Sequence, residues 1–285
     1  MNKPFFLSIL ICFISISLFA QVRRPKKSFL QKTEQRVGLT DVKLEYYRPS
    51  MKGRVIFGEL EEYDKIWRTG ANKNTTITFS KAVEIDGKKL EAGSYAIYSK
   101  PNIEFWEIFF YIDIENWGVP KEWNDEKIAL RTIVPTFKLN RDVETLTINI
   151  DDIKESSASL GIMWERTYVS IPIEFHFKEV LEENTKAELH KNVTEFHVAA
   201  VNYHERNYDL EQAKIWMEQA ISLREKPNYW DYREYSVILS KLKQYDNAIK
   251  AAKYCIELSK MNDGNREKVA IELSNKSIKE WASKK

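Results

Sequence analysis

The sequence has few residues of the types on which most catalytic and metal sites depend. Its 285 residues include two cysteines and four histidines, and residues 21–175 contain neither type. A Ser–His–Asp or Cys–His catalytic site therefore cannot lie in that part of the chain. Zinc and copper sites with histidine or cysteine ligands are excluded there for the same reason. We expect no metal site and no cofactor. Carboxylate chemistry, a lysine nucleophile or simple binding remain.

An excess of one charge is also missing. The chain has 44 basic and 42 acidic side chains, which gives a formal net charge of +2. Nucleic-acid binding depends on a concentrated basic face. The one basic cluster consists of Arg23, Arg24, Lys26 and Lys27, close to the N-terminus. We expect no nucleic-acid partner and interpret residues 21–36 as a basic, poorly ordered leader.

Only one long hydrophobic run is present, at residues 1–20. Lys3 precedes an apolar stretch, and Ala20 is followed by the polar Gln21. This pattern is typical of a secretory signal peptide and is short for a membrane span. We expect export to the periplasm or the extracellular space, with no membrane span after cleavage. Cys255 is then the only cysteine left, so a disulfide within the chain is excluded, and we expect its thiol to be buried.

Residues 37–177 show the period-two alternation of β-strands. Val42, Leu44 and Tyr46 alternate with more polar residues, and Asp86-Gly87 is a hairpin signal. FWEIFFYI at 105–112 is apolar on both faces, which favours a central strand. Four further strands are expected, at 127–134, 144–150, 158–164 and 167–173. Many short strands separated by turns predict an antiparallel β-sandwich, jelly-roll-like in class.

The pattern becomes helical over residues 178–285. The segment from Lys178 to Arg206 has no glycine or proline and carries a 4-3-4-3 apolar stripe. Further helices are expected near 208–224, 230–242, 245–261 and 266–283, with Asn228 as a cap. YDLEQAKIWMEQAISL and YDNAIKAAKYCIEL place small residues at matching positions 35 residues apart. This spacing resembles that of tetratricopeptide repeats, so we predict degenerate helical hairpins that contact a protein partner.

Three of the histidines, His190, His197 and His204, are spaced seven residues apart. A seven-residue step is about 10.5 Å of helix rise, which is too long for two of them to share one metal ion. We expect them on the helix surface, beside the apolar stripe.

A basic and aromatic group of residues before one strand is the candidate ligand site. Arginine can clamp a carboxylate or phosphate, tryptophan can stack on a sugar, and asparagine can bind a polar group or cap a turn. The same residues could instead tie down a structural corner. The candidate ligand-binding residues are Arg48, Arg54, Trp67, Arg68, Thr69, Asn72 and Trp117. No catalytic residue is assigned.

Carboxylates leave one enzymatic alternative open, a glycan hydrolase of the cell envelope. Such an enzyme needs two acidic side chains at a fixed separation across a cleft. We would expect Trp67 or Trp117 as the sugar platform in that case. The sequence offers acidic side chains at several turns, among them Glu61 and Asp113, but it does not show which of them face one another.

Several blocks in order resemble one family of exported bacterial proteins, the domain of unknown function 2911. The most specific blocks are RPSMKGR at 48–54, WRTGAN at 67–72 and AGSY at 92–95. The resemblance covers about residues 28–175 and departs at Glu91, where the family tends to have proline. It implies an exported β-rich domain, sometimes followed by helical repeats, and brings no established activity.

These observations favour an exported, non-enzymatic binding protein. The β domain would bind a small polar or glycan ligand or a peptide, and the helical repeats would bind a protein. A purely structural scaffold is the third hypothesis, in which WRTGAN is only a folding corner.

Overall fold

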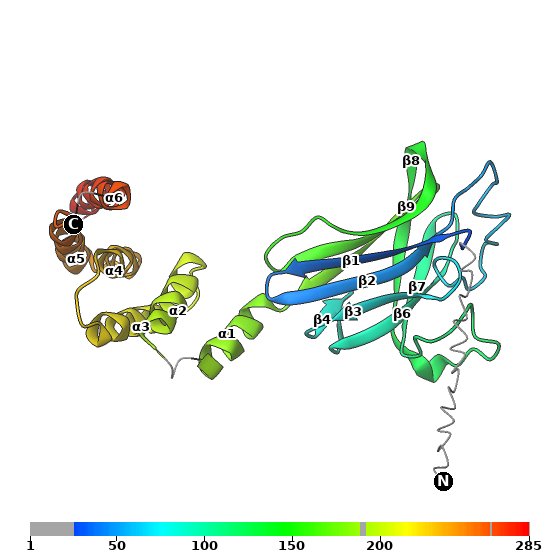
Figure 1. Ribbon diagram of the computed structural model, residues 1–285, viewed down its shortest axis with the longest axis horizontal. Helices are drawn as coiled ribbons and strands as arrows, with labels where there is room; N and C mark the ends of the chain where they lie inside the picture. Colours follow the sequence, from blue (N-terminus) through cyan, green and yellow to red (C-terminus); the bar gives the residue numbers. More distant parts are fainter. Residues whose placement is uncertain (1–25, 189–191, 263, 285) are drawn as a thin grey trace, which may run out of the picture. The chain divides into compact units, whose positions relative to one another are not determined.

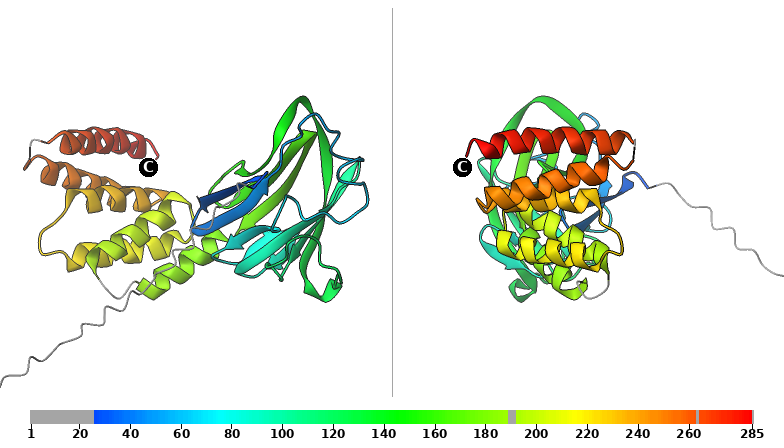
Figure 2. Two further views of the ribbon diagram at one scale, coloured as in Figure 1. Left: turned by 45° about the vertical axis from the view of Figure 1, so that its right-hand side comes forward. Right: turned by 90° about the vertical axis from the view of Figure 1, so that its left-hand side faces the viewer.

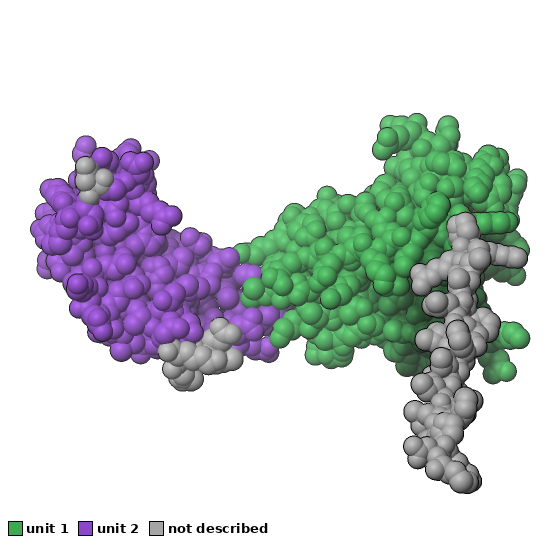
Figure 3. Space-filling model, in the orientation of Figure 1, with its two compact units in different colours: residues 1–175 green, residues 176–285 purple. Residues whose placement is uncertain are grey.

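A computed structural model describes residues 26–188, 192–262 and 264–284 of the chain (Figure 1). The chain divides into two compact units, residues 1–175 and residues 176–285 (Figure 3). The predicted signal peptide at residues 1–20 lies outside the described residues. Within the described ranges, none of the helices combines the length and the apolar character needed to cross a membrane.

The first unit, called the β unit below, is built from strands. Its described part contains β1 (Phe29–Val37), β2 (Thr40–Arg48), β3 (Thr75–Phe79), β4 (Val83–Ile85), β5 (Lys88–Leu90), β6 (Gly93–Lys100), β7 (Phe105–Tyr111), β8 (Ile128–Asp151) and β9 (Ser157–Phe175), with one 3-10 turn at Asp125–Lys127. All pairings between these strands are antiparallel, in the order β1-β2-β3-β6-β7-β8-β9-β4-β5. The predicted antiparallel β domain is thus confirmed.

Two predictions about the β unit need correction. Residues 29–36, expected in a poorly ordered leader, form most of β1, because every residue from Phe29 to Val37 pairs with β2. The four strands expected between 127 and 173 are two long ones. β8 pairs first with β7 and then with β9, and register shifts bend it where turns were expected. Hydrogen bonds therefore join all nine described strands into one sheet, and the division into two sandwich layers stays a prediction.

The core lies on the inner face of the sheet. Val42, Leu44 and Tyr46 of β2 point inward, as their alternation predicts, together with alternate residues of β3, β6 and β7. The Asp86-Gly87 hairpin also forms as expected, with both residues at positive φ (55° and 68°), the geometry of a tight hairpin turn.

The central strands are buried on their outer face as well. Ala96 and Tyr98 of β6 and Phe109 and Tyr111 of β7 form a second, smaller cluster. Side chains from the segment between β7 and β8, including Ile114 and Trp123, pack over it. The apolar 105–112 stretch is therefore central, as predicted, and the covering segment is bonded through the Asn116 carbonyl to Asn74, just before β3.

The second unit, called the helical unit below, contains six helices among its described residues. They are α1 (Phe177–Glu188), α2 (Val193–Glu205), α3 (Leu210–Leu223), α4 (Tyr229–Lys241), α5 (Tyr245–Ser259) and α6 (Asn265–Ala282). The single helix expected from Lys178 to Arg206 is wrong. Asn192 begins α2 with a reciprocal capping box to Glu195, which separates α2 from α1.

Successive helices α2 to α6 pack each on the next (Figure 2). Their contacts use small buried residues such as Ala213, Ala220, Ala248 and Cys255, all fully buried. Asn228 caps α4 as predicted, accepting from the Trp230 N–H. A helical region after the β unit is confirmed, and its tetratricopeptide character stays a prediction.

Candidate functional site

Trp67 belongs to the aromatic core of the β unit. Only 4% of it is exposed. Its ring stacks on Trp164 with centroids 5.9 Å apart and meets Phe57 and Trp106 edge-on. The indole N–H donates to the Gly70 carbonyl at 3.3 Å. A side chain placed in this way anchors the fold, and a sugar could not stack on it.

Arg48 and Arg54 hold backbone segments together at the end of β2. Arg48 donates to the Leu146 carbonyl (2.9 Å), to Gln31 Oε1 (2.7 Å) and to Thr147 Oγ1 (2.8 Å). Arg54 donates to the carbonyls of Met51 (2.8 Å) and Ser50 (2.6 Å). These guanidinium groups are directed at acceptors within the chain, which is the pattern of structural arginines.

Local hydrogen bonds hold the Arg68–Asn72 turn in place. Arg68 donates to the carbonyls of Gly70 and Trp117, both at 3.4 Å. Thr69 is fully buried, its hydroxyl bonds to that of Ser99, and its backbone has φ of 53°. A β-branched residue in the left-handed region is a conformational outlier that its surroundings must impose. Asn72, at φ 59°, adopts the same region at little cost.

Trp117 is the exposed member of the predicted group, with 66% of its surface accessible. The Lys26 ammonium lies 4.7 Å from its ring centroid and 4.6 Å from that of Tyr47. The structure thus brings Trp67, Arg68, Thr69 and the Trp117 backbone together, and it places Arg48 and Arg54 where β2 meets β8.

Glu61 is a carboxyl group with a raised pKa, and it lies near two of the predicted arginines, Arg54 and Arg68. Burial raises its pKa to about 7, and the positive charges of Arg68 and Arg54 oppose that shift only in part. The sequence included Glu61 among many acidic residues and gave no reason to separate it from them. By contrast, Glu107 is buried between Lys100 (3.0 Å) and Arg131, and serves as a structural ion-pair partner.

A groove of about 500 Å³ lies over the outer face of β1, β2 and β3. Thr76 and Thr78 of β3 form part of its floor, and Ile114 from the covering segment forms part of its wall. Tyr47 lies at the β2 side, where its hydroxyl accepts a hydrogen bond from Lys26 at 2.9 Å. The volume is within the range of small-molecule sites in proteins.

Asn74 is the residue of this groove that the sequence did not single out. It is 3% exposed, and neither Nδ2 nor Oδ1 of its amide has a hydrogen-bond partner within the described part of the chain. Its backbone N–H donates to the Asn116 carbonyl at 3.0 Å, which holds the covering segment over it. Buried amides without partners are rare and destabilising, so this one requires an explanation.

The charged side chains along the groove are paired with one another. Lys32 lies 2.6 Å from Glu45, Lys43 lies 3.3 Å from Glu34, and Lys73 lies 2.9 Å from Glu115. The first two pairs join residues directly opposite in the β1–β2 register. The groove therefore contains the Asn74 amide, which has no partner among the described residues, and charged side chains that are paired with opposite charges.

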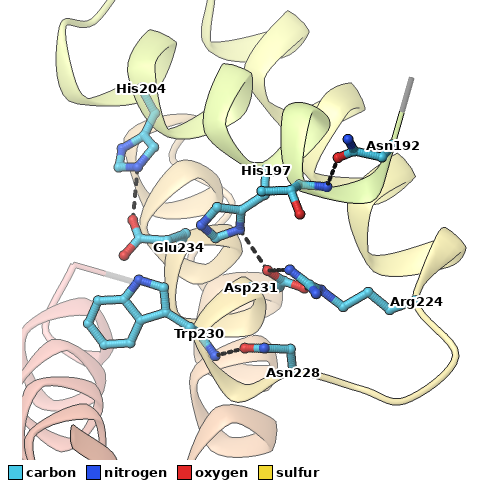
Figure 4. Close-up of polar contacts among 9 residues, drawn as sticks. Asn192, His197, His204, Arg224, Asn228, Trp230, Asp231 and Glu234 are labelled. Carbon is cyan, nitrogen blue, oxygen red and sulfur yellow. Dashed lines mark hydrogen bonds and ion pairs between the residues drawn. The ribbon is translucent and has the colours of Figure 1, made fainter. Parts of the chain in front are cut away.

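A second polar cluster lies between helices of the helical unit (Figure 4). His197 Nδ1 of α2 is 2.6 Å from Asp231 Oδ1 of α4, and Arg224 contacts the same carboxylate. Burial would raise the pKa of Asp231, but hydrogen bonds and charge from His197 and Arg224 outweigh it and hold the pKa below its usual range. His204 Nε2 lies 2.9 Å from Glu234 Oε2, also on α4.

This cluster corrects the expectation of surface histidines. His204 is 4% exposed, and His197 is largely covered by α4. The heptad spacing placed both on one face of α2 correctly, but it could not reveal that α4 carries the matching carboxylates. His190 lies outside the described residues. Within the described ranges, no group of three or more metal-ligating side chains is present.

Comparison with protein-family models identifies the family of the first unit. The family model described as "Protein of unknown function (DUF2911)" matches residues 28–173, which is about half of the chain. No curated protein and no solved structure matches. The matched range includes β1 and the Asn74 groove.

Proposed function

The chain belongs to the DUF2911 family of proteins of unknown function, and we propose that it is a non-enzymatic binding protein whose β unit holds a small uncharged polar ligand in the Asn74 groove. The observation that carries the proposal is the Asn74 amide, which lines the groove and is buried without a partner among the described residues. A ligand that supplies both a donor and an acceptor would remove the cost of burying that amide. The proposal keeps the predicted kind of ligand and moves the site from WRTGAN to the residues just after it.

The WRTGAN turn has a supporting role in this proposal. Thr75 Oγ1 donates to the Thr69 carbonyl at 2.6 Å, so the strained turn fixes the start of β3. Asn74 directly precedes that strand, at the position that continues the outward row of Thr76 and Thr78. The turn therefore sets the direction of the Asn74 side chain without contacting the ligand.

Thermal unfolding of the chain without residues 1–20 tests the proposal. Uncharged oligosaccharides, uncharged peptides and matched phosphorylated compounds are added to the wild type and to Asn74→Leu and Asn140→Ala variants. A ligand that binds only the folded state raises the melting temperature. We expect an uncharged compound to do so in the wild type and in Asn140→Ala, where the altered side chain is exposed. The shift should disappear in Asn74→Leu.

The Asn74→Leu variant also separates a binding role from a structural one. Leucine has a similar size and no polar atoms, so it removes the buried unpartnered amide, and this variant should be at least as stable as the wild type. A stable variant that no longer binds supports the proposal. A clear loss of stability, or a shift that persists in Asn74→Leu, would contradict it.

The helical unit is proposed to bind a protein. A groove of about 650 Å³ lies between the start of α4 and the start of α6, lined by Tyr229, Trp230 and Val269 with Arg266. Trp230 and Val269 are substantially exposed, which suits a contact surface. A photo-crosslinking residue at position 230 should give a discrete adduct in cells that Val269→Glu abolishes. An adduct unaffected by Val269→Glu would show that this groove is not the contact.

The hydrolase alternative draws support from one observation, the pKa of Glu61 near neutrality, which suits a general acid. Trp67, one of its two candidate sugar platforms, lies in the core. Release of reducing ends from an envelope glycan, abolished by Glu61→Gln in a folded protein, would establish it in place of simple binding.

A further inference from the structure

We infer that the Asn74 groove recognises an N-acetylated sugar through its acetamido group. This inference rests on the proposed binding function and gives the ligand a chemical class. Four features of the groove carry it: the Asn74 amide, the paired charges of the floor, the apolar side chain of Ile114, and the position of the groove on the face of the sheet.

The Asn74 amide requires a ligand that presents a hydrogen-bond donor and an acceptor side by side. Its Nδ2 can donate two hydrogen bonds and its Oδ1 can accept two. Both atoms are without partners within the described residues. In the acetamido group of a sugar the N–H and the carbonyl point in opposite directions, so its N–H can donate to Oδ1 while the oxygen of the neighbouring ring hydroxyl accepts from Nδ2. A carboxylate has no donor to offer Oδ1.

The paired charges select against an ionic ligand. Lys43 and Glu45 line the groove, and each already has a partner of opposite charge on β1. A phosphate or carboxylate entering there would have to displace Glu34 or Glu45 from its lysine. Sugar hydroxyls can bond to the remaining donor and acceptor positions of these pairs and of Thr76 without adding charge.

An apolar contact is available beside the amide. Ile114 lines the groove and packs against the outer cluster under the covering segment. The same segment bonds to the Asn74 backbone through Asn116. The methyl group of an acetamide can rest on Ile114 while its N–H donates to Asn74 Oδ1.

The sheet geometry favours a sugar over an extended peptide. A bound peptide strand gains most of its affinity from main-chain hydrogen bonds at a sheet edge. The groove floor lies on the face of the sheet, where the backbones of β2 and β3 already pair with each other, as in Lys43 with Thr78 and Glu45 with Thr76. Only side chains are offered there, and they suit a compact ring with hydroxyl and amide substituents.

Calorimetric titration with matched trisaccharides tests the inference. Triacetylchitotriose and cellotriose differ in bearing acetamido or hydroxyl groups at the same ring positions. We expect the wild type and Asn140→Ala to bind triacetylchitotriose, and to bind cellotriose at least about tenfold more weakly, because the amide hydrogen bond to Asn74 and the methyl contact with Ile114 are lost. Asn74→Leu, which stays folded, should lose that preference. N-acetylglucosamine alone shows whether one ring suffices.

The other outcomes are distinct from one another. Equal binding of the two trisaccharides would overturn the acetamido inference and leave the proposed binding function standing. Binding of N-acetylalanine methylamide but of neither trisaccharide would overturn it in favour of a peptide ligand. If no uncharged compound binds in this titration or in the thermal panel, the inference fails together with the proposed function.

Discussion

The β unit and the helical unit bury their interiors with different side chains. The core of the β unit contains large aromatic residues such as Trp67, Trp106 and Trp164, which pack edge-on or stacked. The helical unit brings its helices together over alanines, and it also buries Asp231 and His204. Aromatic burial stabilises through apolar area, which is insensitive to pH, whereas buried ion pairs depend on protonation. The two units should therefore respond differently to mutation and to pH.

The largest expected effect comes from the aromatic core. Trp67→Ala should lower the free energy of unfolding of the β unit by about 3–5 kcal/mol, because it removes a buried indole and leaves a cavity. Urea unfolding followed by circular dichroism should show an earlier β-unit transition and an unchanged helical one. Trp117→Ala, at an exposed position, is the matched control and should change the free energy of unfolding of the β unit by no more than about 0.5 kcal/mol. A shift of both transitions would show that the units do not unfold independently.

A somewhat smaller loss is expected in the helical unit. Asp231→Ala should cost about 3 kcal/mol, because Arg224 and His197 lose the carboxylate that compensates their partly buried groups. The helical transition alone should move. Glu280→Ala, which removes an exposed carboxylate paired with Lys284, should leave it unchanged. Equal effects of the two substitutions would refute the structural importance of the buried cluster.

Asp231 should make the helical unit less stable as the pH falls, and Glu61 should make the β unit less stable as the pH rises. The pKa of Asp231 is lowered on folding from 3.8, so its contribution to stability is present above that value and is lost as the pH falls through the folded pKa. The pKa of Glu61 is raised from 4.5 to about 7, so its contribution is present below 4.5 and is lost as the pH rises to about 7. Between these pH values the free energy of unfolding of the β unit should fall by at most about 3 kcal/mol because of Glu61.

Urea midpoints of each transition across this pH range measure the difference. Glu61→Gln should flatten the β-unit profile between about pH 4.5 and about pH 7 while the helical profile stays as it was. A β-unit midpoint that rises with pH over that interval in the wild type would contradict the assignment of a raised pKa to Glu61.

The smallest effect concerns the strained turn. Thr69→Ala and Thr69→Gly both remove the hydroxyl bonded to Ser99, but only glycine accepts φ of 53° without strain. Thr69→Gly should therefore be more stable than Thr69→Ala by about 1 kcal/mol. Equal urea midpoints for the two variants would show that the backbone at position 69 relaxes.

The sequence predicted element types well because alternation and helical periodicity are local. It did not predict Asn74, although Asn74, Thr76 and Thr78 continue one outward row, because its burial depends on a segment about forty residues further along. The sequence did not predict the partners of His197 and His204 for the same reason, because those partners lie on another helix, α4. WRTGAN was noticed for its residue types, yet Trp67 and Thr69 are buried and Arg68 bonds to backbone carbonyls, so these three side chains hold the corner.

The register of β4 has a consequence for the order in which the β unit can be completed. Val83 and Glu84 pair with Phe175 and Glu174 at the end of β9. During synthesis the β4–β5 hairpin therefore appears about ninety residues before the strand it joins. Until Phe175 arrives, the inward side chains of that hairpin, Val83, Ile85 and Leu90, lack the strand that shields them in the finished sheet. The nascent β unit thus carries exposed apolar surface until nearly its last residue has been made.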